Sequence, residues 1–196
     1  MGQACGGSRT RCWPSACART PPRERERRPP RPGPFDAAGV SAWVDGGWGV
    51  DALAGHATRA HDDLDLVLAH DQLDQARRAL ATAGFTTVLR DRPPAALALA
   101  DGAGRCVDLH PVTGSGRDGG RQLLPDGGKF CYPAPVAGAT GGRTVPCVDA
   151  ATQGRCLLGY PPRDKDRHDL ARLHARTGAA LPAEYAGCAE CAGYAD

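Results

Sequence analysis

Two aspartates on an expected strand give the clearest chemical signal in this sequence. Residues 62–68 alternate acidic and apolar side chains after the first position, a pattern typical of a β-strand. Side chains two residues apart share one face of a strand, so Asp63 and Asp65 project together while the leucines beside them face the core. Neighbouring carboxylates repel each other unless a cation lies between them, and Mg²⁺ prefers carboxylate, water and phosphate oxygens. The pair therefore predicts a Mg²⁺ site, whereas Asp62 lies on the opposite face of the strand.

A third acid, Asp108, lies on another expected strand, residues 105–109. The sequence Asp-Gly-Ala-Gly at residues 101–104 joins this strand to residues 96–100 and predicts a hairpin. A carboxylate there would supply the third ligand of a two-metal centre, or the base that removes a proton from an attacking hydroxyl. Because most strand aspartates are simply solvated, the spacing by itself leaves both a functional and a solvated Asp108 open.

Two adjacent glycines, Gly46 and Gly47, stand between a short apolar strand at residues 41–44 and a short helix expected at residues 48–53 and ended by Gly55. Glycine lets the backbone approach a ligand closely, and the amides at a helix start can bind a phosphate. Most Gly-Gly pairs are only turns. This pair is a stronger sign of a functional site than Gly-Gly alone because the acidic strand follows it, with Asp63 sixteen residues after Gly47.

These residues need elements that position them, and the remaining pattern predicts a small mixed sheet with flanking helices and a helical C-terminal part. The further expected elements are a helix at 71–83 capped by Asp71 and ended by Gly84, a strand at 85–89, a Gly-rich loop at 111–128, a strand at 144–148, a helix at 149–158 capped by Asp149 and a helix at 164–176 ended by Gly178. Their order predicts an α+β fold rather than a doubly wound one.

Charge separates the chain into two parts. Residues 1–36 carry eight Arg and three acids, a net +5, and the rest of the chain carries 16 basic and 19 acidic groups, a net −3. Residues 1–34 also hold seven of the 17 prolines, so we expect a disordered tail there, an inert extension rather than a nucleic-acid or membrane-surface arm. The mildly acidic body argues against a nucleic-acid partner, and no run approaches the roughly 18 apolar residues of a membrane-spanning helix. A cytoplasmic protein with no membrane partner is the expectation.

The C-terminal residues 183–196 are also expected to form a flexible tail. Cys188 and Cys191 within it have the spacing of half a zinc site. The sequence contains no matching second half, so a tail with two thiols is the simpler interpretation.

In combination, these motifs resemble the DNA-polymerase-β-like nucleotidyltransferase superfamily, and within it the aminoglycoside and lincosamide adenylyltransferases, which modify antibiotics. The resemblance covers about residues 36–182 and predicts a nucleotidyltransferase domain at residues 35–182. Its most specific part is the block Thr-Arg-x-His-Asp-Asp-x-Asp. The segments that carry it are residues 46–53, 58–66, 107–110 and 159–170.

The resemblance implies an enzyme that transfers AMP from ATP to a hydroxyl of an antibiotic-like small molecule and releases pyrophosphate. Asp63 and Asp65 would hold the Mg²⁺ ions that bridge the nucleoside triphosphate. Asp108 would be the general base for the acceptor hydroxyl, or a ligand of the second metal ion. Gly46 and Gly47 would cradle the phosphates.

Basic residues would complete the nucleotide site. Arg59 would pair with a phosphate through its planar guanidinium, and Lys165 and Arg167, with His168, would reach the nucleotide from the helix at residues 164–176. An equally good interpretation of that helix is a solvated face with ion pairs four residues apart.

Three polar residues near these motifs have expected supporting roles. Asp51 is expected to cap or support the helix that follows the glycines. His61 is expected to make a hydrogen bond rather than to hold a metal ion, and His110 to contact the acceptor from the strand face of Asp108.

The N-terminal segment departs from the family pattern. Family members usually begin with an amphipathic helix before the Gly-Gly strand, whereas this chain has an Arg/Pro segment there and keeps only the end of a helix at residues 35–40. We therefore expect exposed core surface or lower stability.

Two alternative functions stay open. The domain would act on another acceptor, such as a protein or a nucleic acid, or it would bind nucleotide without turnover. The intact set of Asp63, Asp65 and Asp108 favours an enzyme.

Overall fold

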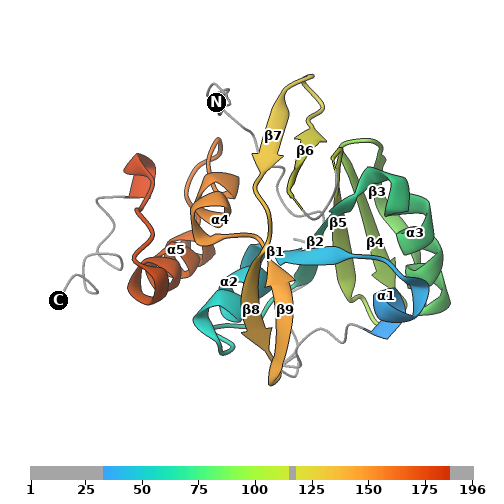
Figure 1. Ribbon diagram of the computed structural model, residues 1–196, viewed down its shortest axis with the longest axis horizontal. Helices are drawn as coiled ribbons and strands as arrows, with labels where there is room; N and C mark the ends of the chain where they lie inside the picture. The colour runs from blue at the N-terminus through green and yellow to red at the C-terminus, as the bar shows by residue number, and fades with distance from the viewer. Residues whose placement is uncertain (1–32, 115–117, 186–196) are drawn as a thin grey trace.

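The computed structural model describes residues 33–114 and 118–185 and has the expected α+β architecture (Figure 1). Its strands are β1 (Ala42–Asp45), β2 (Asp63–Ala69), β3 (Phe85–Arg92), β4 (Ala96–Asp101), β5 (Cys106–Val112), β6 (Gly120–Leu123), β7 (Lys129–Tyr132), β8 (Val136–Thr140) and β9 (Arg143–Cys147). One mixed sheet has the order β3-β4-β5-β2-β1-β9-β8, and β6 and β7 form a separate two-stranded ribbon. In the large sheet β2 pairs parallel with β5 and β1 parallel with β9, and the other pairs are antiparallel.

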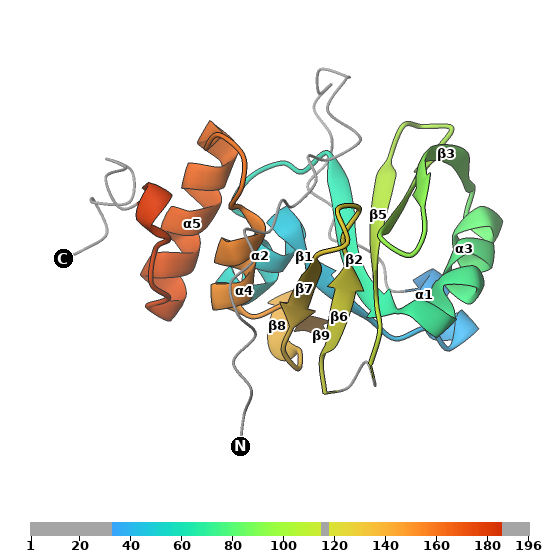
Figure 2. The same ribbon diagram turned by 90° about the horizontal axis from the view of Figure 1, so that it is seen from above.

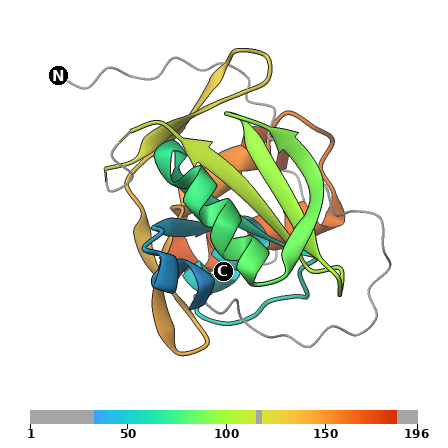
Figure 3. The same ribbon diagram turned by 90° about the vertical axis from the view of Figure 1, so that its right-hand side faces the viewer.

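The helices are α1 (Gly33–Ala38), α2 (Gly46–Ala54), α3 (Leu73–Thr82), α4 (Ala150–Cys156) and α5 (Asp164–Thr177), with short 3₁₀ turns η1 (His70–Gln72) and η2 (Ala183–Tyr185). Helices α1, α2 and α3 contribute to the core on one face of the large sheet, and the β6–β7 ribbon packs on the opposite face. Figures 1 and 2 show α1 and α3 near the end of the sheet formed by β3 and β4, and α2, α4 and α5 grouped near its other end. Figure 3 shows α3 lying across the strands at the β3 edge.

Alternation along β2 separates a core face from a polar face. Leu66 and Leu68 are buried in the main core, together with Leu80 of α3. Val67 points the other way and packs against Tyr132 of the ribbon. Since Asp63 and Asp65 alternate with the leucines, they share the face of Val67, and the predicted division of the strand is confirmed.

Several helix ends also match the expectation. Gly55 ends α2 and Gly178 ends α5, both in the left-handed conformation with φ of 80° and 68°, which glycine adopts at no steric cost. Asp149 caps α4 by accepting a hydrogen bond from the Thr152 amide at 3.0 Å. The cap predicted at Asp71 is wrong, because Asp71 lies within η1 and α3 begins after it without a side-chain cap.

The loop expected at residues 111–128 is only partly a loop. Strand β5 extends to Val112, and β6 lies inside the expected loop. Strands β7 and β8 follow and have no counterpart among the expected elements. These strands have four or five residues and little apolar alternation, so their sequence carries no period-2 signal of its own.

The described residues extend slightly beyond the expected domain of residues 35–182 at both ends. They begin in α1, whose Phe35 and Ala38 pack against the main core, so this short helix covers core surface that its reduced length was expected to expose. They extend to Tyr185, which is buried and donates a hydrogen bond to the Leu157 carbonyl at 3.0 Å. Most of the expected N-terminal tail, as well as Cys188 and Cys191, lies outside the described residues. In the described part no helix is long and apolar enough to cross a membrane.

Candidate active site

Strand register brings the acids into one row across the sheet. Asp45 at the end of β1 is the partner of Asp65 on β2, and Asp65 is the partner of Asp108 on β5. On the other side of β5, Ala98 is the partner of Asp108, and Arg90 of β3 is the partner of Ala98. Residues in such a row lie on one face at the strand spacing of about 4.8 Å, so three carboxylates and one guanidinium converge there.

This row borders a cleft that encloses about 1030 Å³, its open mouth included. The cleft lies between the acidic face of the sheet, the β6–β7 ribbon and the helices α4 and α5. Of the predicted site residues it is lined by Gly46, Gly47, Arg59, Asp63, Asp65 and Lys165. Residues that sequence reasoning missed also line it, among them Asp45, Arg90, Arg92, Gln122, Tyr132, Gln153 and Arg163.

Asp45 is a missed acidic member of the site. It caps α2 by accepting a hydrogen bond from the Gly46 amide at 2.8 Å, and Tyr132 donates to its other oxygen at 3.4 Å. Burial raises the pKa of the Asp45 carboxyl to about 6, and the charge of Asp65 adds to this rise. An Asp directly before a Gly-Gly helix start is an N-cap signature, which was the available signal for this residue.

His110 links the acidic row to the ribbon. Its Nε2 lies 3.3 Å from Asp65 Oδ1, and its Nδ1 lies 3.2 Å from Gln122 Nε2. Burial opposes the charged ring, but the hydrogen bond with Asp65 and the charges of Asp108, Asp65 and Asp45 outweigh it and raise the pKa of His110 to about 9. The carboxylates of the row therefore favour the protonated form of His110, whose charge compensates part of the row.

This charge predicts a pH dependence of stability. The folded-state pKa of His110, about 9, lies above its ordinary 6.5, so the stability that its charge contributes is present below pH 6.5 and is lost as the pH rises through 9. For the metal-free protein in EDTA, we expect the free energy of unfolding in urea to fall by on the order of 3 kcal/mol across this range. His110→Gln should flatten that part of the profile. Equal slopes in both proteins would contradict the assignment.

Asp108 is held by Arg90. Arg90 Nη1 lies 3.1 Å from each carboxylate oxygen of Asp108, and both side chains are buried. Burial raises the pKa of Asp108, while the charges of His110 and Arg90 oppose that rise. Arg90 lines the cleft, whereas Asp108 lies behind it and is absent from the lining. The pairing joins β3 to β5 across β4, and neither residue's sequence neighbourhood indicates it.

The two glycines fit tightly against the acidic strand and the loop before it. A Cβ at Gly46 would overlap Asp65 Oδ2 and lie 2.9 Å from Asp65 Cγ, and Gly46 also has a φ of +59°. A Cβ at Gly47 would overlap His61 Nδ1 and lie 2.6 Å from Arg59 Nη2. Both positions therefore require glycine because side chains of the acidic strand and the loop before it approach the backbone closely.

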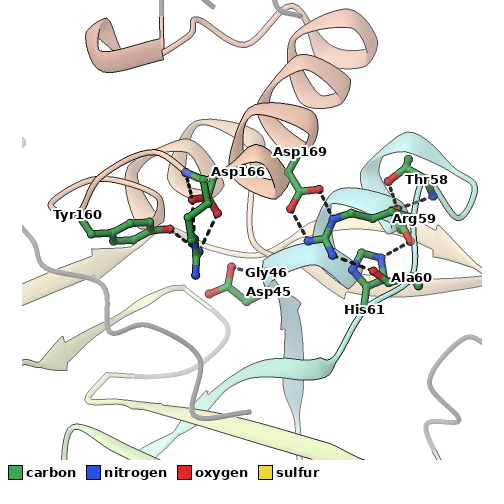
Figure 4. A network of polar contacts seen from close by, with 11 residues as sticks. Asp45, Gly46, Thr58, Arg59, Ala60, His61, Tyr160, Asp166 and Asp169 are labelled. Carbon is green, nitrogen blue, oxygen red and sulfur yellow. Dashed lines mark hydrogen bonds and ion pairs between the residues drawn. The ribbon is translucent and has the colours of Figure 1, made fainter. Parts of the chain in front are cut away.

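The loop before β2 is fixed by polar contacts (Figure 4). Asp51 accepts hydrogen bonds from the amide and hydroxyl of Thr58 at 2.8 and 2.6 Å and lies 2.6 Å from His61 Nε2. Although burial opposes it, the hydrogen bonds of His61 and Thr58 hold the pKa of Asp51 below its ordinary value. The structural role expected for Asp51 and the hydrogen-bonding role expected for His61 are confirmed.

Arg59 makes a two-point ion pair with α5. Its Nε and Nη2 donate to the two carboxylate oxygens of Asp169 at 2.8 and 2.6 Å, and its Nη1 donates to the Ala60 carbonyl at 2.9 Å. Arg59 still lines the cleft, beside Gly47. The pair connects residues 110 positions apart and fixes α5 against the acidic strand.

This ion pair predicts a stability effect. Asp169→Asn keeps the shape of the side chain but removes the charge that compensates the mostly buried Arg59, so we expect the free energy of unfolding in urea to fall by about 2 kcal/mol. Arg77→Gln, which removes the exposed pair with Asp91, is the matched control and should change it by less than about 0.5 kcal/mol. Equal losses in the two variants would contradict the structural role of the Arg59–Asp169 pair.

The expected basic residues of α5 divide in two. Lys165 lines the cleft, together with Arg163, whose guanidinium is held by Asp166 and Tyr160. Arg167 instead donates to the Pro162 carbonyl at 3.0 Å and lies 3.5 Å from Asp164, on the surface of its own helix. The structure therefore brings Lys165 to the other predicted site residues but not Arg167.

The chain is similar to known antibiotic-modifying proteins. The profile of the aminoglycoside-2''-adenylyltransferase family matches residues 34–173. A lincosamide resistance protein of Staphylococcus haemolyticus is 26% identical over 145 residues, covering 73% of this chain and 89% of that protein. The lincomycin-bound crystal structure of the lincosamide antibiotic adenylyltransferase LnuA has a TM-score of 0.65 at 26% identity, covering 73% of this chain and 91% of that one.

A second solved structure shares the fold. The solution structure of the antibiotic-resistance factor ANT(2'')-Ia has a TM-score of 0.55 at 18% identity, covering 72% of this chain and 77% of that one. The family profile spans well over half of the chain and includes the glycines, the acidic row and most of α5. The chain therefore belongs to the aminoglycoside-2''-adenylyltransferase family and is a nucleotidyltransferase of the antibiotic-modifying type.

Proposed function

We propose that this enzyme transfers AMP from ATP to a hydroxyl of a lincosamide- or aminoglycoside-type antibiotic, with Mg²⁺, and releases pyrophosphate. One observation carries the proposal. Two carboxylates of one strand, Asp63 and Asp65, line the same cleft as Gly46 and Gly47 at the start of α2. The carboxylates proposed to hold the metal ion and the glycines proposed to bind the phosphates therefore line one cleft, as the binding of a metal-bound nucleoside triphosphate requires.

The donor set fits a hard divalent cation. Asp63 and Asp65 offer oxygen ligands. Burial and the charge of Asp65 raise the pKa of the neighbouring Asp45 carboxyl, and a cation bound beside these carboxylates would reduce their mutual repulsion. Asp63 and Asp65 would hold Mg²⁺. When bound, the ion neutralises phosphate charge and orients the triphosphate.

The protein's own groups would position the two substrates. The start of α2 at Gly46 and Gly47 lines the cleft and would face the phosphate oxygens, and the macrodipole of this nine-residue helix favours their negative charge; the Gly46 amide itself donates to Asp45. Arg59, immobilised by Asp169, and Lys165 supply positive charge on the α5 side. The acceptor oxygen would then form a bond to the α-phosphorus as the bond from that phosphorus to the bridging oxygen of the β-phosphate breaks, and the hydroxyl proton would pass to solvent water as pyrophosphate departs. Catalysis is largely positioning and charge neutralisation.

The acceptor class rests on the relatives. Lincosamide is the substrate named for the two relatives at 26% identity, and aminoglycoside is named by the family profile. The test uses the full chain with ATP, Mg²⁺ and a panel of both antibiotic classes, and measures pyrophosphate release and the gain of one adenylyl group on the acceptor by mass spectrometry. Tight binding of a non-hydrolysable ATP analogue without turnover of any acceptor would instead support a nucleotide-binding domain.

A further inference from the structure

Arg90 occupies the acidic row where a second cation would bind. One ligand atom each of Asp65, Asp108 and His110 lies within 4.8 Å of the others, a spacing suited to a metal ion. Arg90 Nη1 lies 3.1 Å from both oxygens of Asp108, so one guanidinium nitrogen already bridges the carboxylate. A metal ion bound by Asp108 would have to displace it.

The sheet is built to let Arg90 reach this position. Arg90 and Asp108 lie on strands separated by β4, and the residue between them in the row is Ala98. A side chain no longer than a methyl group leaves the space through which the arginine crosses to Asp108. The crossing is buried, with Arg90 8% exposed and Asp108 3% exposed.

Arg90 also faces the substrate space, which Asp108 does not. Arg90 lines the cleft together with Asp65 and His110, while Asp108 lies behind it. The carboxylate thus fixes the guanidinium, and the guanidinium presents positive charge next to the strand that carries Asp63 and Asp65. A planar guanidinium is well suited to phosphate oxygens.

We propose that Arg90, anchored by Asp108, supplies the second positive charge of the transfer site in the place of a second metal ion. This inference rests on the proposed function, since it assigns a role at the same site. Asp108 is then a positioning residue for Arg90 rather than a direct metal ligand. The enzyme works with one divalent ion, held by Asp63 and Asp65.

The direct test counts metal ions. Mn²⁺ replaces Mg²⁺, and the Mn²⁺ bound per chain is measured by electron paramagnetic resonance in the presence of a saturating non-hydrolysable ATP analogue. The full natural chain should bind one Mn²⁺, and Arg90→Ala should bind two, because the Asp108 carboxylate is released to hold an ion together with Asp65. Arg90→Lys keeps a cation and should bind one. Two ions in the natural chain, or one in Arg90→Ala, would overturn the proposal.

Kinetics separates positioning from folding. Asp108→Asn, which removes the anchor of Arg90 and cannot hold a second ion, should lower kcat by about 100-fold with a smaller change in the KM for the acceptor. Arg90→Ala should lose a similar factor when Mg²⁺ suffices for one ion only and recover as Mg²⁺ is raised, whereas Arg90→Lys should recover part of kcat without extra Mg²⁺. Thermal unfolding of each variant checks that the fold is retained, and Arg77→Gln on the outer surface is the matched control. Unchanged kcat in a folded Asp108→Asn, or in a folded Arg90→Ala at the lower Mg²⁺ concentration, would overturn the proposal. A natural chain that binds no Mn²⁺ with the analogue would contradict the proposed function itself, and this inference with it.

Discussion

Asp63→Asn and Asp65→Asn should each lower adenylyl transfer by about 1000-fold or more while leaving the protein folded. Both side chains line the cleft, and asparagine keeps their size while removing the negative charge that binds the metal ion. The fold should persist, because the core face of β2 consists of its leucines and the substitutions leave that face unchanged. Pyrophosphate release at saturating ATP and acceptor measures the loss, and isothermal titration with Mn²⁺ measures metal binding.

The neighbouring residue provides the matched control. Asp62 is an exposed acid directly before β2 and lies outside the cleft lining. Asp62→Asn removes the same charge within three residues of the other two substitutions, so a general electrostatic effect would appear in it as well. We expect it to retain nearly full activity. If it falls as far as Asp63→Asn, charge near the strand rather than ligation would be responsible.

Gly46→Ala is expected to have the second largest effect, a loss of kcat of about 100-fold or more. The added Cβ would overlap Asp65 Oδ2 and lie 2.9 Å from Asp65 Cγ, so the carboxylate or the helix start must move. Misplacement of a positioned group by about 1 Å costs on the order of 100-fold in rate. Because φ at Gly46 is +59°, the substitution also strains the backbone, and the free energy of unfolding should fall by about 1 kcal/mol.

Gly55→Ala separates backbone strain from the clash. Gly55 has a φ of +80°, and a Cβ there would meet nothing within 4 Å. It should lose about the same stability as a result of strain, about 1 kcal/mol, and retain its kcat. Comparable kcat in the two variants, measured at the same temperature and with equal folded fractions, would show that Gly46 is not needed for close approach to Asp65.

The local pattern of the sequence was sufficient for the centre of the fold. Alternation along residues 62–68 predicts which face of β2 bears Asp63 and Asp65, and the positive-φ glycines Gly55 and Gly178 mark two helix ends. These features depend on side chains a few residues apart. Strands β6 to β8 are different, because they are short and are stabilised by pairing partners rather than by an alternating pattern of their own.

The parts of the site that escaped prediction depend on register between distant segments. Asp45 joins the acidic row because β1 pairs antiparallel with β2, and Arg90 reaches Asp108 because β4 places alanine between them. Arg59 was expected to pair with phosphate, and its contact with Asp169 arises only once α5 packs against the loop before β2. A single sequence shows the residue types at these positions but not which strands become neighbours.

The assignment as an adenylyltransferase is tested most directly by the fate of labelled phosphorus. The full chain is incubated with Mg²⁺, a lincosamide or an aminoglycoside, and ATP labelled on either its α- or its γ-phosphate, and the acceptor is separated and counted. The proposed reaction predicts that the α-label appears on the antibiotic and that the γ-label appears only in pyrophosphate. Transfer of the γ-label to the acceptor, or no transfer of the α-label to any antibiotic of either class, would contradict it.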